Sequence, residues 1–72
     1  MEESKKKYIN EILAEVGEEH NDWKKRCVEE NTEFAYRRFL ESGARLSGME
    51  HVLRVLGCLI AYKEDGTPYI SN

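Results

Sequence analysis

The segment "LSGMEHVLRVLGCLIAYKEDGTPYI", residues 46–70, carries the clearest structural signal, because its hydrophobic spacing changes from a helical repeat to an extended one. Apolar residues recur every three or four positions up to Leu56, and Gly57 then stands where a helix would end. Beyond it, aliphatic and aromatic residues flank Asp65-Gly66, a pair typical of a tight hairpin turn. The segment therefore predicts a helix followed by two antiparallel strands.

The helix of this segment also has a predicted beginning. Ser47 and Glu50 form the pattern S-x-x-E, in which each side chain accepts a hydrogen bond from a backbone amide of the first turn. Met49, Val52 and Leu53 would then lie on one apolar face. We expect a short capped helix at about residues 48–56.

The hairpin is predicted to use strands at about residues 58–64 and 67–71, joined by a two-residue type I′ turn at Asp65-Gly66. In that register Tyr62 lies opposite Tyr69 and Lys63 lies opposite Pro68. The missing N–H of Pro68 points outward, which predicts an edge strand. Both faces of the hairpin carry apolar side chains, with Cys58, Ile60, Tyr62 and Tyr69 on one and Leu59, Ala61 and Ile70 on the other.

The N-terminal part of the chain is predicted to be helical. Apolar residues at helical spacing begin at Ile9 and continue through Val16 and Trp23, so a long helix, or one kinked near Gly17, is favoured. The alternative places a break within residues 17–22, with a second helix capped there.

A further helical segment covers "NTEFAYRRFLESG", residues 31–43, and Gly43 suits a left-handed C-terminal cap. Whether residues 4–42 form one helix or two stays open. The predicted fold is α+β and mainly α. Its order is a long or kinked helix, a second helical segment, the short capped helix and the hairpin, all within a single domain of residues 1–72.

Composition narrows the classes of function. The net charge of −3 does not suggest a general nucleic-acid binder, and no apolar run reaches the length of a membrane span. The N-terminus lacks the features of a signal peptide, and two cysteines without a C-x-x-C pattern suit a reducing compartment. No metal-binding or phosphate-binding motif occurs, so we expect a cytoplasmic protein with no cofactor, no metal and no enzymatic activity.

A chain of 72 residues offers little core, and this favours self-association into a homo-oligomer, as a dimer or larger. The residues predicted to contact another copy are apolar side chains of the hairpin and one helix face: Ile60, Tyr62, Tyr69, Leu59, Ile70 and Trp23. A second predicted surface is an acidic ridge for a larger protein partner, at helical spacing: Glu11, Glu15, Glu18 and Asp22. A solvated helix face is the simpler interpretation of that ridge.

The predicted function is a small non-enzymatic protein-interaction module that self-associates and binds or inhibits a larger intracellular partner. Its size suits an accessory protein of the kind that phages encode. The alternative is a phosphate, nucleotide or nucleic-acid binder on a winged-helix-like arrangement, using Arg37, Arg38, Arg45 and Arg54. Against it, the helix at 48–56 offers few cations, and Arg37 is placed to pair with Glu33 and Glu41.

Overall fold

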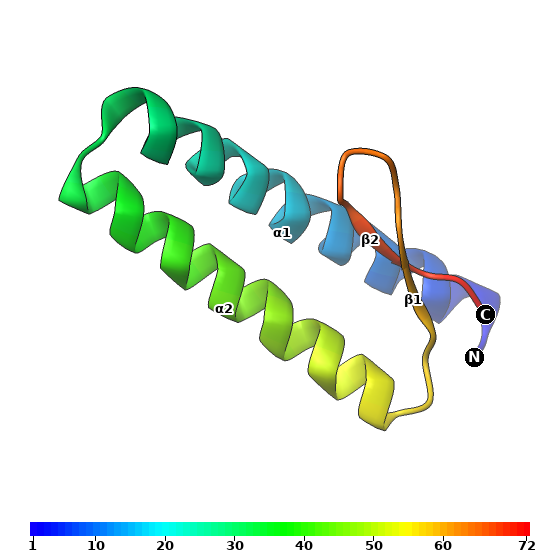
Figure 1. The fold of residues 1–72 in the computed structure, drawn as a ribbon. Helices are drawn as coiled ribbons and strands as arrows, with labels where there is room; N and C mark the ends of the chain where they lie inside the picture. Colours follow the sequence, from blue (N-terminus) through cyan, green and yellow to red (C-terminus); the bar gives the residue numbers. More distant parts are fainter.

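A computed structural model describes all residues, 1–72. Helix α1 (Glu3–Glu30) and helix α2 (Glu33–Val55) run antiparallel, and strands β1 (Ile60–Tyr62) and β2 (Pro68–Ile70) form a two-stranded antiparallel sheet. In Figure 1 the strand pair lies beside α1, and both termini lie near the same end. The predicted class, α+β and mainly α with a C-terminal hairpin, is confirmed.

Helix α1 is uninterrupted, which confirms the long helix and removes the alternative break within residues 17–22. It ends at Asn31, whose φ of 51° is left-handed and whose N–H bonds to the carbonyl of Cys27. Gly17 is buried, and a Cβ placed there would lie 3.2 Å from Cδ of Pro68. The glycine inside α1 therefore makes room for the hairpin.

Helix α2 begins after Thr32, whose hydroxyl accepts the N–H of Ala35, and continues without interruption to Val55. The prediction of a separate capped helix at 48–56 is therefore wrong in its start, although the helix ends near the expected residue. Ser47 and Glu50 lie in the helix interior, where amides already bond to carbonyls of the preceding turn. The side chains of Ser47 and Glu50 therefore have no free backbone N–H groups to cap.

Gly43 lies inside α2 and does not end a helix, contrary to the prediction. It lies where the two helices approach each other closely. A Cβ at this position would lie 3.0 Å from Cε1 of His20 on α1. The His20 ring is fixed by a 2.9 Å hydrogen bond to the hydroxyl of Ser42, and it stacks on Phe39 at 5.0 Å. The glycine thus permits close packing of the helices.

The strand register differs by one residue from the predicted one, pairing Ile60 with Ile70 and Tyr62 with Pro68. The cause is the turn. The carbonyl of Lys63 accepts the N–H of Gly66, and the loop has its only positive φ, 89°, at Gly66. A type I′ turn would need positive φ at two residues, so the predicted turn is excluded. The observed pattern is that of a three-residue loop, in which a type I turn is followed by a left-handed glycine.

The one-residue shift exchanges the faces of the second strand. Ile70, now 2% exposed, joins Cys58 against the helices, and Tyr69 moves to the outer face. The main hydrophobic cluster consists of Leu13, Leu53, Cys58 and Ile70, and Ala35 is buried separately from it. The outward N–H of Ile70 bonds to Oδ1 of Asn10 at 2.8 Å, so α1 covers the edge of β2.

Candidate functional site

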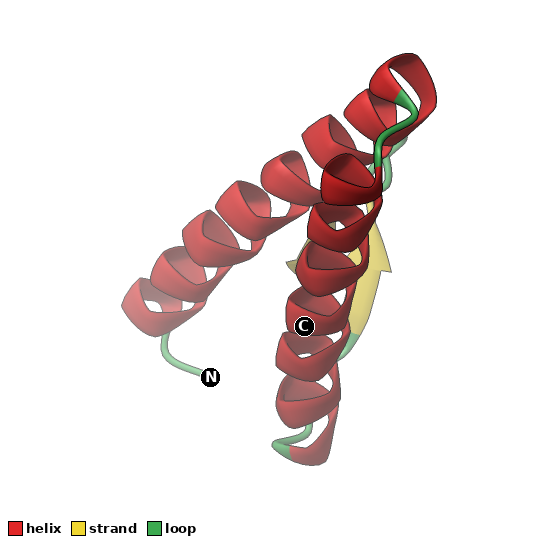
Figure 2. Cartoon of the chain, turned by 90° about the vertical axis from the view of Figure 1, so that its left-hand side faces the viewer, coloured by secondary structure: helices red, strands yellow, loops and turns green.

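The side of the helix pair that the hairpin does not cover holds an apolar groove. The helices converge at their connection and spread toward the opposite ends (Figure 2). The groove has a volume of about 410 Å³ and almost no polar surface. It is lined by two residues of α1 and four of α2, namely Ile9, Ile12, Gly48, Met49, Val52 and Leu53.

The groove continues into a patch of exposed apolar side chains at the end of α2. Val52 is 57% exposed, and Val55 and Leu56 follow it at the spacing that places residues on one side of a helix. We call Val52, Val55 and Leu56 the open-end patch. Several large apolar side chains this close together on one surface are typical of an interaction site.

The chain exposes more surface than a compact monomer of its size. Its accessible surface is 5268 Å², whereas monomeric proteins of 8.4 kDa expose about 4,600 Å². Its radius of gyration is 13.3 Å, compared with about 11 Å for a compact domain of this length. The excess of about 650 Å² and the larger radius of gyration both describe an elongated molecule.

A polar cluster ties the hairpin to α2. The hydroxyl of Tyr62 donates to Glu50, which is 9% exposed, and accepts a 2.9 Å hydrogen bond from Arg54. The hydrogen bond to Glu50, together with partial burial, raises the pKa of Tyr62 above its ordinary value. If Tyr62 lost its proton, the negative tyrosinate would lie beside the carboxylate of Glu50. The neutral form of Tyr62 therefore stabilises the packing of the hairpin on α2.

Tyr62→Phe is expected to destabilise the protein by about 1 kcal/mol, because it removes two hydrogen bonds and leaves Glu50 poorly paired. With the folded pKa raised, the stabilisation by Tyr62 is complete below its ordinary pKa of 10.0 and is lost as the pH rises through the folded value. Urea denaturation of the wild-type and Tyr62→Phe proteins at pH 7 and above pH 10 measures the difference in their free energies of unfolding. This difference should be smaller at high pH.

Tyr36→Phe is the matched control, since Tyr36 is exposed on the same helix as Glu50. A Tyr62→Phe protein that unfolds like the Tyr36→Phe protein at pH 7 would show that the cluster does not hold the hairpin.

The six residues predicted for self-association do not form one surface. Ile70 is in the core, Ile60 packs against it, and Tyr69 is half-buried on the outer face. Leu59 is exposed and directly precedes β1. Trp23 lies near the other end of the molecule, where it packs edge-on against Phe34.

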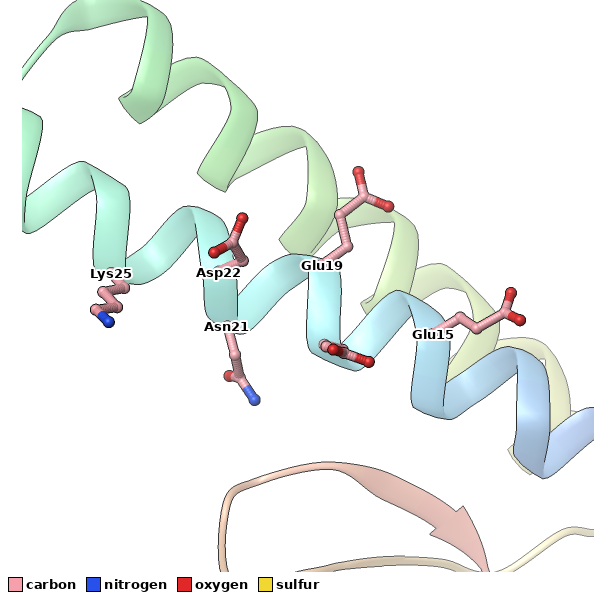
Figure 3. A pocket seen from close by; sticks show the side chains of 6 residues that line it. Glu15, Glu19, Asn21, Asp22 and Lys25 are labelled. Atoms are coloured by element: carbon pink, nitrogen blue, oxygen red, sulfur yellow. The ribbon is translucent and has the colours of Figure 1, made fainter.

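The predicted acidic ridge runs along α1. Glu15, Glu18 and Asp22 border one shallow depression, and Glu11 lies closer to the N-terminus. The labelled side chains in Figure 3 fan out from the helix instead of converging on one point. Asp22 pairs with Arg26 at 3.6 Å. The ridge is therefore a diffuse negative surface, and no three His, Cys, Asp or Glu side chains are grouped to hold a metal ion.

The four arginines of the alternative site are spread along α2. Arg37 and Arg54 are 17 positions apart, roughly 26 Å along a helix. Each guanidinium has a carboxylate neighbour: Glu33 for Arg37, Glu41 for Arg38, Glu19 for Arg45 and Glu50 for Arg54. The winged-helix-like arrangement is wrong, because α2 contains no turn where that arrangement needs one.

The comparisons with known proteins add no further constraint on function. No family model, curated protein or solved structure matches this chain. Neither helix combines the length and the apolar character that crossing a membrane requires. The groove and the open-end patch are therefore the features on which a functional proposal rests.

Sequence reasoning did not identify the groove. Ile9, Ile12, Met49 and Val52 have the helical spacing of a buried face, and spacing alone does not distinguish a covered face from an open one. The hairpin is too narrow to cover both sides of two spread helices, since β2 lies mainly on α1. The available signal was the size of the hairpin, because strands predicted at about residues 58–64 and 67–71 are too short to cover both sides of the helical segments predicted for the rest of the chain.

Proposed function

We propose that this chain is a non-enzymatic protein-interaction module that self-associates, with a second copy covering the groove and the open-end patch. The observation that carries the proposal is a groove lined almost entirely by hydrocarbon in a chain whose main hydrophobic cluster has four buried residues. Burying that surface would stabilise the fold as well as the assembly, since a core this small contributes little alone.

A second copy is favoured as the occupant because the surface combines a hollow with projecting side chains. Ile9 and Ile12 form one wall of the groove, whereas Val55 and Leu56 project from the end of α2. A two-fold arrangement brings the same patch of both copies together, so that projections of one copy meet the hollow of the other.

The proposal also includes a larger protein partner and an intracellular location. Glu11, Glu15 and Glu18 make no ion pair within the chain, so they are free to face a basic surface. Both cysteines are free thiols, which suits a reducing compartment. An accessory or inhibitory role toward that partner is consistent with the size of the chain.

Val52→Glu is expected to raise the dissociation constant of the dimer at least tenfold, because each copy would place a carboxylate in an apolar interface. Sedimentation equilibrium over a wide concentration range measures this constant, with circular dichroism to verify the fold. Val28→Glu is the matched control, since Val28 is 80% exposed and lies near the far end of α1. A wild-type chain that stays monomeric at several hundred micromolar, or equal effects of the two variants, would contradict the proposal.

A further inference from the structure

At four of the five glycines, a close contact or a positive φ within the chain favours glycine over other residues. Gly48 has neither. Gly17 and Gly43 allow close approaches to the hairpin and to His20, and Gly57 and Gly66 have a φ of 89°. At Gly48 a Cβ would meet no atom within 4 Å, and the residue lies inside α2. Glycine is the least favourable helix residue apart from proline, so alanine would suit this position better in an isolated chain.

Gly48 is also part of the groove. It lines the groove together with Met49 and Val52 of the same helix, and Ile9 and Ile12 form the opposite side. A helix whose contact residue lacks a side chain lets another backbone approach closely, because the distance between packed helices depends on the side chains at the contact. The groove thus has one point at which its wall is bare backbone.

We infer that a helix of a second copy of this chain crosses α2 at Gly48. The inference rests on the proposed self-association and names its closest point of contact. Since the two copies would present the same surface, Gly48 and the neighbouring Met49 and Val52 of one copy meet groove residues of the other. The glycine that is unfavourable for the isolated helix is explained by this contact.

The test measures the dissociation constant of three variants of the full chain by sedimentation equilibrium, with helicity followed by circular dichroism. Gly48→Leu should raise the constant at least tenfold, and Gly48→Ala about threefold, because each added side chain separates the helices. Ser47→Leu is the matched control, since Ser47 is exposed, adjacent in sequence and outside the groove lining, and it should change the constant less than twofold.

The outcomes separate this inference from the proposal on which it rests. A dimer that Val52→Glu dissociates but that Gly48→Leu leaves intact overturns the crossing at Gly48 and keeps self-association. A wild-type chain that is monomeric overturns both, and makes another protein the occupant of the groove. Should Gly48→Leu lose helicity, Gly48→Ala keeps the test: higher helicity with a weaker dimer supports the inference, and an equal or tighter dimer overturns it.

Discussion

Leu13→Ala is expected to lower the free energy of unfolding by about 3 kcal/mol, because Leu13 is the central side chain of the core. It is fully buried on α1, and it packs with Leu53 of α2 and with Cys58 and Ile70 of the hairpin segment. Removing it leaves a cavity where three parts of the chain meet. A domain of this length has a stability of roughly 4–11 kcal/mol, so this loss is a large fraction of the total.

Thermal denaturation at a fixed protein concentration measures the effect, which should lower the melting temperature by about 15 °C or more. The concentration is held constant because self-association would itself stabilise the folded state. Val28→Ala on the same helix is the control, and it should change stability by less than about 0.5 kcal/mol because Val28 is exposed. A Leu13→Ala protein as stable as this control would disprove the assignment of the core.

Gly17→Val is expected to separate the hairpin from α1 and to lower the free energy of unfolding by about 3 kcal/mol. A Cβ at Gly17 would already lie 3.2 Å from Cδ of Pro68 and 3.6 Å from Cγ2 of Thr67, and the two methyl groups of valine need still more space. Pro68 and Thr67 are buried and cannot turn aside as a flexible side chain would. The hairpin backbone must therefore move away from the helix.

Hydrogen exchange distinguishes this local effect from general unfolding. The N–H of Ile70 bonds to Asn10 on α1, so its protection should fall more than that of amides near the connection of the two helices. Glu18→Val is the control, because it introduces the same β-branched residue at the next, exposed position. Unchanged protection of Ile70 in Gly17→Val would mean that the hairpin does not pack on α1 at Gly17.

Features that depend on neighbouring residues in the chain agree with the predictions from the sequence. The helical repeat from Ile9 to Trp23 predicted a long helix, and α1 is one. The change of repeat at Gly57 predicted the end of a helix and the beginning of a hairpin, and both occur. These features depend on contacts between near neighbours in the chain, which periodicity and glycine conformation express directly.

The errors have a common origin in contacts between distant residues. Gly43 was interpreted as a helix end, whereas it is a contact point with His20, 23 positions earlier in the chain. Glu50 was assigned to a cap, whereas its carboxylate accepts the hydroxyl of Tyr62 on the hairpin. A glycine or a glutamate serves equally well in either role, and the choice depends on which partner the fold brings near.

The prediction of self-association came from the size of the chain, and the surface proposed for it now differs from the predicted one. The sequence placed it on the hairpin, with Ile60 and Ile70 among its residues, and the structure uses both of these against its own helices. The groove at Ile9, Ile12 and Val52 exists because α1 and α2 spread apart toward their free ends, and no hairpin residue lines it. An angle between two helices is not encoded in the periodicity of either one.

The amino-acid order alone was enough to define two kinds of local structure, amphipathic helices and a C-terminal hairpin, since each depends on residues a few positions apart. The register of the strands, the continuity of α2 through Gly43 and Ser47, and the position of the open groove arose only when the elements packed together. At each of these places a local conformational preference competes with a contact between residues that are distant in the chain. Here the distant contact contributes more free energy and determines the structure.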